Sequence, residues 1–323
     1  MGKYNYRIKL FIITVFFIYL LFDFIKQYCY VKEYYIGNGY HKDVRKDDSI
    51  FVSIASYRDK ECSTTLASIY ENATHPEKVF VGIVQQNKEG DNECEIEQMN
   101  PQNVRILRIN YEDAKGPCYA RYLASGLYQG ETYYFQIDSH MIFNKGWDVD
   151  LINMIKKLPS KSVISHYPVP WDNQDMKKVP TMTHVTRHAN NNSIYNFQSE
   201  YADVKKHFGA AAGMMFMPGE AVKEVYFDSD LDYVFNGEEM LYSARLHTYG
   251  YNFYTPEKNV IFHFYTREKE PKIWDNATKN QKISKSTSII LDRMKNPPPG
   301  YFGDVRTLAS YKKLLKSKVR DKK

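Results

Sequence analysis

The stretch Glu131–Asp148, ETYYFQIDSHMIFNKGWD, decides how we interpret the chain. Its apolar and aromatic run, residues 133–137, predicts a short buried strand, and Asp138-Ser139-His140 follows directly. Ligands of open α/β sheets collect beyond the carboxyl ends of the strands, and alternate strand side chains share a face. Asp138 and His140 are therefore expected to lie side by side, where a carboxylate and an imidazole suit Mn²⁺ or another divalent cation. The alternative is a turn cap and a core histidine, because acid-x-His is a common pattern.

Length and composition are those of a globular protein. The 323 residues are 43% hydrophobic and 25% charged, which excludes wholesale disorder. The net charge of +6 is modest, and much of it lies near the two ends of the chain. We interpret this basicity as solvated tails and expect no nucleic-acid partner.

The N-terminus carries an apolar run, residues 10–22, behind three basic residues. No small-x-small cleavage pattern follows it, and basic side chains at its borders let it span a thin bilayer. The positive N-terminal flank predicts a lumenal body. We expect residues 1–27 to be the signal anchor of a single-pass type II membrane protein facing the ER or Golgi lumen, followed by a stem over 28–47. Secretion after signal cleavage is the alternative.

The body alternates between predicted strands and helices. The expected strands before the central one are 49–55, 79–84 and 104–109, and the expected helices are 64–73 and 120–128. This order predicts one α/β domain with mainly parallel strands. We place the catalytic domain at 48–270 and a peripheral C-terminal segment with a basic tail at 271–323. Cys62 and Cys94 either form a disulfide in an oxidising lumen or remain buried thiols.

Several motifs occur in one order along this body. They are residues 51–59 (FVSIASYRD), 82–86 (GIVQQ), 116–121 (GPCYAR) and 134–140 (YFQIDSH), with Trp-Asp at 147–148. Together they resemble the polypeptide α-N-acetylglucosaminyltransferase family, which includes enzymes that modify hydroxyproline. More distantly, the acid-x-His strand and a later Gly-Glu segment resemble the mucin-type polypeptide GalNAc-transferases. The resemblance implies a GT-A nucleotide-sugar transferase fold, with a Rossmann-like mixed sheet flanked by helices, a metal-dependent UDP-sugar donor and retention of anomeric configuration.

The resemblance also suggests a third metal ligand. His263 lies in the apolar run 260–264 and is expected to join Asp138 and His140, the alternative being a core histidine. A bound cation at this position can neutralise the charge that develops on a diphosphate leaving group.

Further residues are candidates for the donor site. Arg58 and Arg121 can hold phosphate, because a guanidinium offers paired donors. Asp59 is expected to contact uracil or ribose, and Tyr57 to stack on the base. For these three residues near position 58 the alternative is a salt-bridged turn, and Arg121 fits a structural pair with Asp138 equally well.

A second block, residues 208–250, supplies the remaining candidates. A run of small residues ends at Gly213 and permits close approach of a ligand. Glu238 and Glu239 precede a predicted helix, 240–248, and could simply complement its dipole. The resemblance instead assigns these two acids to the donor sugar or the acceptor, so with Asp138 they are our candidate catalytic residues. Because no obligatory carboxylate nucleophile is evident, a front-face retaining route fits better than a covalent intermediate.

The polar stretch 172–192 lacks clear periodicity and is expected to form a loop over an acceptor groove. We therefore predict a Mn²⁺-dependent enzyme that moves GlcNAc from UDP-GlcNAc to a Ser, Thr or hydroxyproline hydroxyl of a protein. The alternatives are another UDP-hexose, a glycan acceptor, or a sugar-binding protein without turnover.

Overall fold

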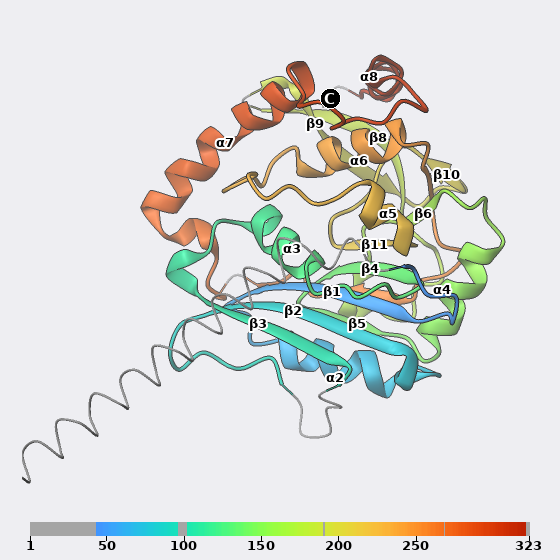
Figure 1. The fold of residues 1–323 in the computed structure, drawn as a ribbon, viewed down its shortest axis with the longest axis vertical. Coiled ribbons are helices and arrows are strands. Elements are labelled where there is room, and N and C mark those ends of the chain that lie inside the picture. Colours follow the sequence, from blue (N-terminus) through green and yellow to red (C-terminus); the bar gives the residue numbers. More distant parts are fainter. Residues whose placement is uncertain (1–42, 96–101, 190, 268, 321–323) are drawn as a thin grey trace, which may run out of the picture.

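The centre of the protein is a sheet in the order β10-β12-β6-β11-β4-β1-β2-β3 (Figure 1). The computed structural model describes residues 43–95, 102–189, 191–267 and 269–320. The strands of this sheet are β1 (Ile50–Tyr57), β2 (Val79–Asn87), β3 (Val104–Asn110), β4 (Tyr133–Asp138), β6 (Ser162–Ser165), β10 (Lys206–His207), β11 (Met214–Pro218) and β12 (Asn252–Tyr254). The helices are α2 (Cys62–Glu71), α3 (Pro117–Ser125), α4 (Trp147–Lys156), α5 (Gly219–Glu224), α6 (Glu238–Thr248), α7 (Ala277–Lys295) and α8 (Leu308–Ser317).

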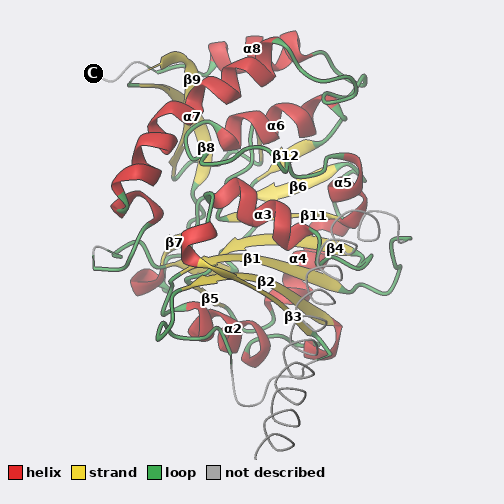
Figure 2. Cartoon of the chain, turned by 60° about the vertical axis from the view of Figure 1, so that its left-hand side comes forward, coloured by secondary structure: helices red, strands yellow, loops and turns green. Residues whose placement is uncertain are grey.

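Helices cover both faces of this sheet (Figure 2). Successive side chains of a strand point to opposite faces. Val52 of β1 and Phe135 of β4 pack with residues of α2 and α4 on one face. Phe51 and Tyr134 lie on the other face, with residues of α5 and α6. Each such buried side chain contributes roughly 1.5–3 kcal/mol of hydrophobic stabilisation, so β4 is held firmly through the interior.

β4 lies where the strand direction changes. It pairs in parallel with β1 on one side and antiparallel with β11 on the other. A second sheet, β5 (Met141–Phe143), β13 (Ile261–His263) and β7 (Val169–Pro170), begins directly after the carboxyl end of β4. In the β5–β13 pair His263 is opposite Met141. This pairing brings the C-terminal part of the chain to the end of the central strand.

The prediction of an α/β fold is confirmed, and each predicted strand and helix of the first half overlaps an observed one. Within the eight-stranded sheet, the described pairs that run parallel are those among β3, β2, β1 and β4 and the β12–β6 pair. β11 and β10 run antiparallel to their neighbours, so the sheet is mixed.

The expectation of a loop over residues 172–192 is wrong for its second half. β8 (Thr181–His188) and β9 (Asn191–Glu200) form an antiparallel hairpin. Buried apolar side chains at Met182, Val185, Ile194 and Phe197 hold it against the rest of the molecule. A register shift between residues 182 and 184 breaks the alternation of these buried positions. This irregularity explains why periodicity did not reveal the strand.

The segment after residue 270, expected to be peripheral, contributes to the same apolar cluster as the hairpin. Ile290 and Met294 of α7, and Tyr311 and Leu315 of α8, are buried there. Figure 1 shows these two helices beside α6 and the hairpin.

The cysteine alternatives are settled for two residues. Cys62 and Cys94 form a disulfide with their Cα atoms 5.1 Å apart, and Cys118 is a buried thiol. The predicted signal anchor and most of the stem lie outside the described residues. Within the described ranges, no helix combines the length and hydropathy that a membrane span requires.

Candidate active site

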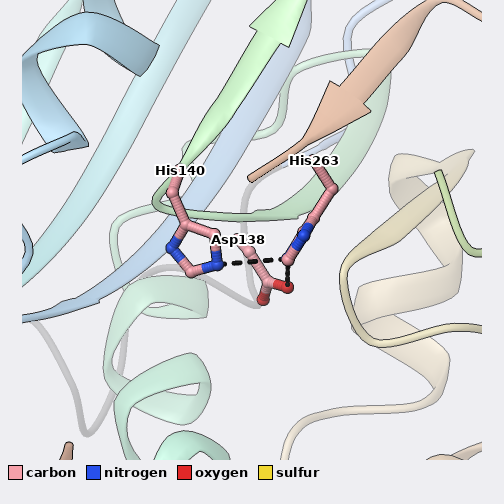
Figure 3. Close-up of side chains that lie close together, drawn as sticks. All are labelled: Asp138, His140 and His263. Atoms are coloured by element: carbon pink, nitrogen blue, oxygen red, sulfur yellow. Dashed lines mark hydrogen bonds and ion pairs between the residues drawn. The ribbon is translucent and has the colours of Figure 1, made fainter. Parts of the chain in front are cut away.

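Three predicted metal ligands converge at the carboxyl end of β4 (Figure 3). One potential ligand atom from each of Asp138, His140 and His263 lies within 4.8 Å of the others. The Nε2 atoms of the two histidines are 3.1 Å apart, and His263 Nε2 is 3.2 Å from Asp138 Oδ2. Two imidazole nitrogens and a carboxylate oxygen are donors that suit Mn²⁺ and similar cations. These residues therefore fit a divalent metal ion.

The local backbone explains this convergence. Asp138 ends β4, and the chain turns at Ser139-His140 before β5. The amide of Phe264 donates to the carbonyl of His140 with an N–O distance of 3.0 Å, which extends the β5–β13 pairing. Asp138 and His263, which are 125 residues apart in the sequence, are thus fixed side by side.

Asp138 is kept ionised by its surroundings. Burial raises the pKa of this carboxyl, but the hydrogen bond with His263, the two histidines and Arg121 lower it more. The net pKa lies well below the usual aspartate value. Gly213 packs against this carboxylate, because a Cβ at that position would lie 2.7 Å from Asp138 Oδ2. A larger side chain would displace the carboxylate.

Asp59 has a different environment from the one expected. It is 2% exposed, and its Oδ2 lies 2.7 Å from His140 Nδ1 and 2.6 Å from the Ser139 hydroxyl. Arg267 Nη2 is 3.0 Å from the same oxygen. A carboxylate with these partners holds His140 in one orientation. Asp59 also lines the large pocket described below, so its expected contact with uracil or ribose stays a prediction.

Arg121 joins the metal-ligand cluster to the start of α6. Its Nη1 donates to Glu238 Oε2 over 2.7 Å, and its Nη2 lies 3.6 Å from Asp138 Oδ1. The Cys118 thiol is 2.9 Å from the same Glu238 oxygen. The structural pair of Arg121 with Asp138 is thus present, and Arg121 also lines the large pocket.

Glu239, the next residue, belongs to a different hydrogen-bond network from Glu238. It accepts hydrogen bonds from the Ala212 amide, over 2.8 Å, and from the Tyr167 hydroxyl. Burial raises the pKa of Glu239 to about 7, although these two hydrogen bonds lower it. The group can therefore change its protonation near neutral pH.

A pocket of about 460 Å³ opens beside the metal-ligand cluster. Ligand pockets of small-molecule sites commonly measure ~300–1,000 Å³, so a nucleotide-sized molecule fits. Tyr57 and Arg121, two of the candidate donor-site residues, are in its wall. Arg58 is not among the residues that line this pocket. It forms a bidentate salt bridge with Asp91, with N–O distances of 2.7 and 3.0 Å, and its guanidinium lies over the Tyr111 ring.

Comparisons with known proteins identify the family. A family model described as Glycosyltransferase (GlcNAc) matches residues 49–102 and 95–296. The chain belongs to the GlcNAc glycosyltransferase family. It is accordingly a glycosyltransferase. No curated protein sequence matches it.

Solved structures show that the chain has the predicted GT-A fold. The structure of GalNAc-T7 with UDP, GalNAc and Mn²⁺ aligns at a TM-score of 0.53 and 13% identity. It covers 82% of this chain and 54% of GalNAc-T7, so the chain spans about half the length of that relative. TarS 1-349 of S. aureus in complex with UDP-GlcNAc aligns at a TM-score of 0.54 and 14% identity, over 83% of this chain and 71% of TarS.

Sequence reasoning missed four residues at the candidate site. Tyr167 holds Glu239, Arg267 holds Asp59, and Tyr265 and Trp274 line the large pocket. Two of them, Tyr265 and Arg267, stand within four residues of His263 in the stretch HFYTR. Proximity to a predicted ligand was the only available signal for them. Trp274 lies beyond the segment we expected to form the site.

Proposed function

We propose that the protein uses a bound divalent cation to transfer N-acetylglucosamine from UDP-GlcNAc to a hydroxyl of a protein. The observation that carries the proposal is the convergence of Asp138, His140 and His263 beside a pocket of nucleotide size. Family membership supports GlcNAc as the sugar. The UDP-GlcNAc complex of TarS and the UDP and Mn²⁺ complex of GalNAc-T7 support a UDP donor and Mn²⁺.

The residues divide the work by position. Asp138, His140 and His263 would hold the cation, which supplies Lewis-acid stabilisation of the diphosphate leaving group when bound. Arg121, fixed by Glu238, presents its guanidinium to the same pocket, where it can pair with a phosphate oxygen. Tyr57 offers a ring for the base in the pocket wall.

We extend the proposal to retention of the anomeric configuration. A covalent glycosyl intermediate needs a carboxylate nucleophile. Glu238 is engaged by Arg121, and Glu239 by Tyr167 and Ala212. These contacts support a front-face route, with Glu238 and Glu239 shaping the sugar and acceptor site. The acceptor we propose is a Ser, Thr or hydroxyproline hydroxyl of a protein, and a glycan is the alternative.

We further propose a single-pass type II membrane protein whose body faces the ER or Golgi lumen. The apolar run 10–22 behind basic residues supports the anchor, and the Cys62–Cys94 disulfide is typical of an oxidising compartment. Protease treatment of intact microsomes should leave the C-terminal tail protected, and carbonate extraction should leave the protein in the membrane. Release by carbonate would favour the secreted alternative, and cleavage of the tail would contradict the lumenal orientation.

The catalytic proposal is tested by UDP release from a panel of UDP-sugars, with Mn²⁺ or EDTA. We expect Mn²⁺-dependent release from UDP-GlcNAc, accelerated by an acceptor, and reduced at least ~100-fold in Asp138→Ala. Asp150→Ala is the matched control, because Asp150 pairs with Lys258 at the surface and should keep full activity. If a folded wild-type protein releases UDP from no donor, the proposal fails.

A further inference from the structure

A second cavity lies beside the candidate active site. It measures about 40 Å³ and is lined mainly by apolar side chains, among them Ala211, Leu231 and Leu241. One water needs roughly 10–15 Å³ of such space, so this cavity has room for a small functional group. Arg121 lines both this cavity and the large pocket, so the two spaces lie on either side of this residue.

Gln136 contributes an unpartnered acceptor to this cavity. Its side chain is 2% exposed, and its Nε2 donates to the Ala212 carbonyl over 2.6 Å. That carbonyl can only accept, which fixes the orientation of the amide and leaves Oε1 on the other side. Gln136 Oε1 is buried and has no hydrogen-bond partner among the described residues. A buried polar atom of this kind is costly unless a ligand or water satisfies it.

The position of Gln136 relates the cavity to the metal-ligand cluster. Gln136 and Asp138 are two residues apart on β4, so their side chains share the face that carries α3 and α6. Two residues of a strand span about 6.6 Å. A sugar attached to a diphosphate held at Asp138 would therefore have its ring substituents near Gln136.

We propose that this cavity is the subsite for the 2-acetamido group of the donor sugar, an inference that rests on the proposed function. The acetamide N–H donates to Gln136 Oε1, and its methyl packs against Ala211, Leu231 and Leu241. A hexose donor with a 2-hydroxyl can satisfy Gln136 but leaves the apolar part of the cavity empty. The cavity thus selects 2-acetamido sugars over plain hexoses.

Equilibrium binding tests the subsite without needing an acceptor. The full chain is titrated calorimetrically with UDP, UDP-Glc and UDP-GlcNAc in the presence of Mn²⁺. The wild type should bind UDP-GlcNAc at least ~10-fold more tightly than UDP-Glc, the scale of a filled apolar site. Ala211→Val fills the cavity and should remove this preference. Gln136→Leu should weaken UDP-GlcNAc at least ~10-fold while the affinity for UDP stays the same.

Gln85→Leu is the matched control, because Gln85 is an equally buried glutamine of the same sheet, on β2, that does not line the cavity. It should keep all three affinities. Equal wild-type affinities for UDP-GlcNAc and UDP-Glc would overturn the subsite, and so would an unchanged preference in Ala211→Val. In both cases binding of UDP would leave the proposed function standing. A folded wild type that binds neither UDP nor any UDP-sugar would overturn the proposed function as well.

Discussion

Single residues at the site owe their chemistry to their neighbours, and Asp59 is the clearest case. Burial raises the pKa of Asp59, but the hydrogen bond from His140 and the charges of His140 and Arg267 lower it more, so the net pKa is depressed. An ionised Asp59 accepts from His140 Nδ1, which leaves the Nε2 lone pair facing His263. A carboxylate that orients a metal-ligating histidine in this way commonly strengthens metal binding.

Asp59→Asn should weaken Mn²⁺ binding about 10–100-fold. The uncharged amide is a weaker acceptor for His140 Nδ1 than the carboxylate, and it leaves the charge of Arg267 without its partner. Titration of the purified protein with Mn²⁺, followed by the electron paramagnetic resonance of the free ion, measures this affinity. The matched control is Asp91→Asn, since Asp91 forms its paired ion bridge with Arg58 outside the pocket. Equal Mn²⁺ affinity in Asp59→Asn and wild type would contradict the orienting role.

Glu239 gives stability a pH dependence of defined sign. Its pKa is raised from 4.5 to about 7 in the folded protein, chiefly by burial. The folded state therefore holds the proton more tightly than the unfolded state. The contribution is fully present below pH ~4.5 and is lost as the pH rises through about 7. Its upper limit is ~3 kcal/mol, from the size of this shift.

Glu239→Gln, whose amide imitates the protonated carboxyl, should lack this dependence. Urea unfolding of both proteins at several pH values between 4.5 and 8 gives the comparison. The wild-type free energy of unfolding should fall, relative to that of Glu239→Gln, as the pH rises. A constant difference across this range would sink the assignment.

At the scale of elements, local pattern predicted what local physics controls. Apolar runs located β1, β2, β3 and β4 because buried strands carry continuous apolar sequence. The sequence did not predict the hairpin β8–β9, because buried and exposed side chains alternate irregularly along it. Strand alternation led us to expect Asp138 and His140 together, but β4 ends at Asp138 and His140 lies in the turn that follows. The resemblance supplied His263. The partner of His140, Asp59, lies 81 residues away, and no local pattern encodes such a pairing.

The disulfide ties one helix to a distant segment. Cys62 is the first residue of α2, and Cys94 lies in the segment after β2. The two cysteines are 32 residues apart in the sequence. Closing a loop of this length removes conformational freedom from the unfolded chain, which corresponds to about 2–4 kcal/mol of stability. Cys62→Ala/Cys94→Ala should lose stability of that order in denaturant unfolding. Dithiothreitol should destabilise the wild type similarly and leave the double variant unaffected. If dithiothreitol left the stability of the wild type unchanged, the proposed contribution of the disulfide to stability would be contradicted.

For the whole molecule, the metal-ligand cluster joins parts of the chain that are far apart in sequence. Asp138 and His140 stand at the end of the central sheet, whereas His263 belongs to the small sheet that follows. The three ligand atoms take this geometry only when both sheets are folded. Binding of a cation should therefore be coupled to the stability of the entire fold.

Mn²⁺ should raise the midpoint of thermal unfolding, and excess EDTA should reverse the rise. At a free concentration 100 times its dissociation constant, a ligand that binds only the folded state adds ~2.7 kcal/mol. His263→Ala removes one ligand and should lose most of this stabilisation. His75→Ala is the control, because His75 is an exposed histidine that pairs with Glu77 away from the cluster. The same Mn²⁺ response in wild type and His263→Ala would show that the ion binds elsewhere. Of the three proposed ligands, His263 is the one that the small sheet supplies, so the proposed site cannot keep its affinity without it.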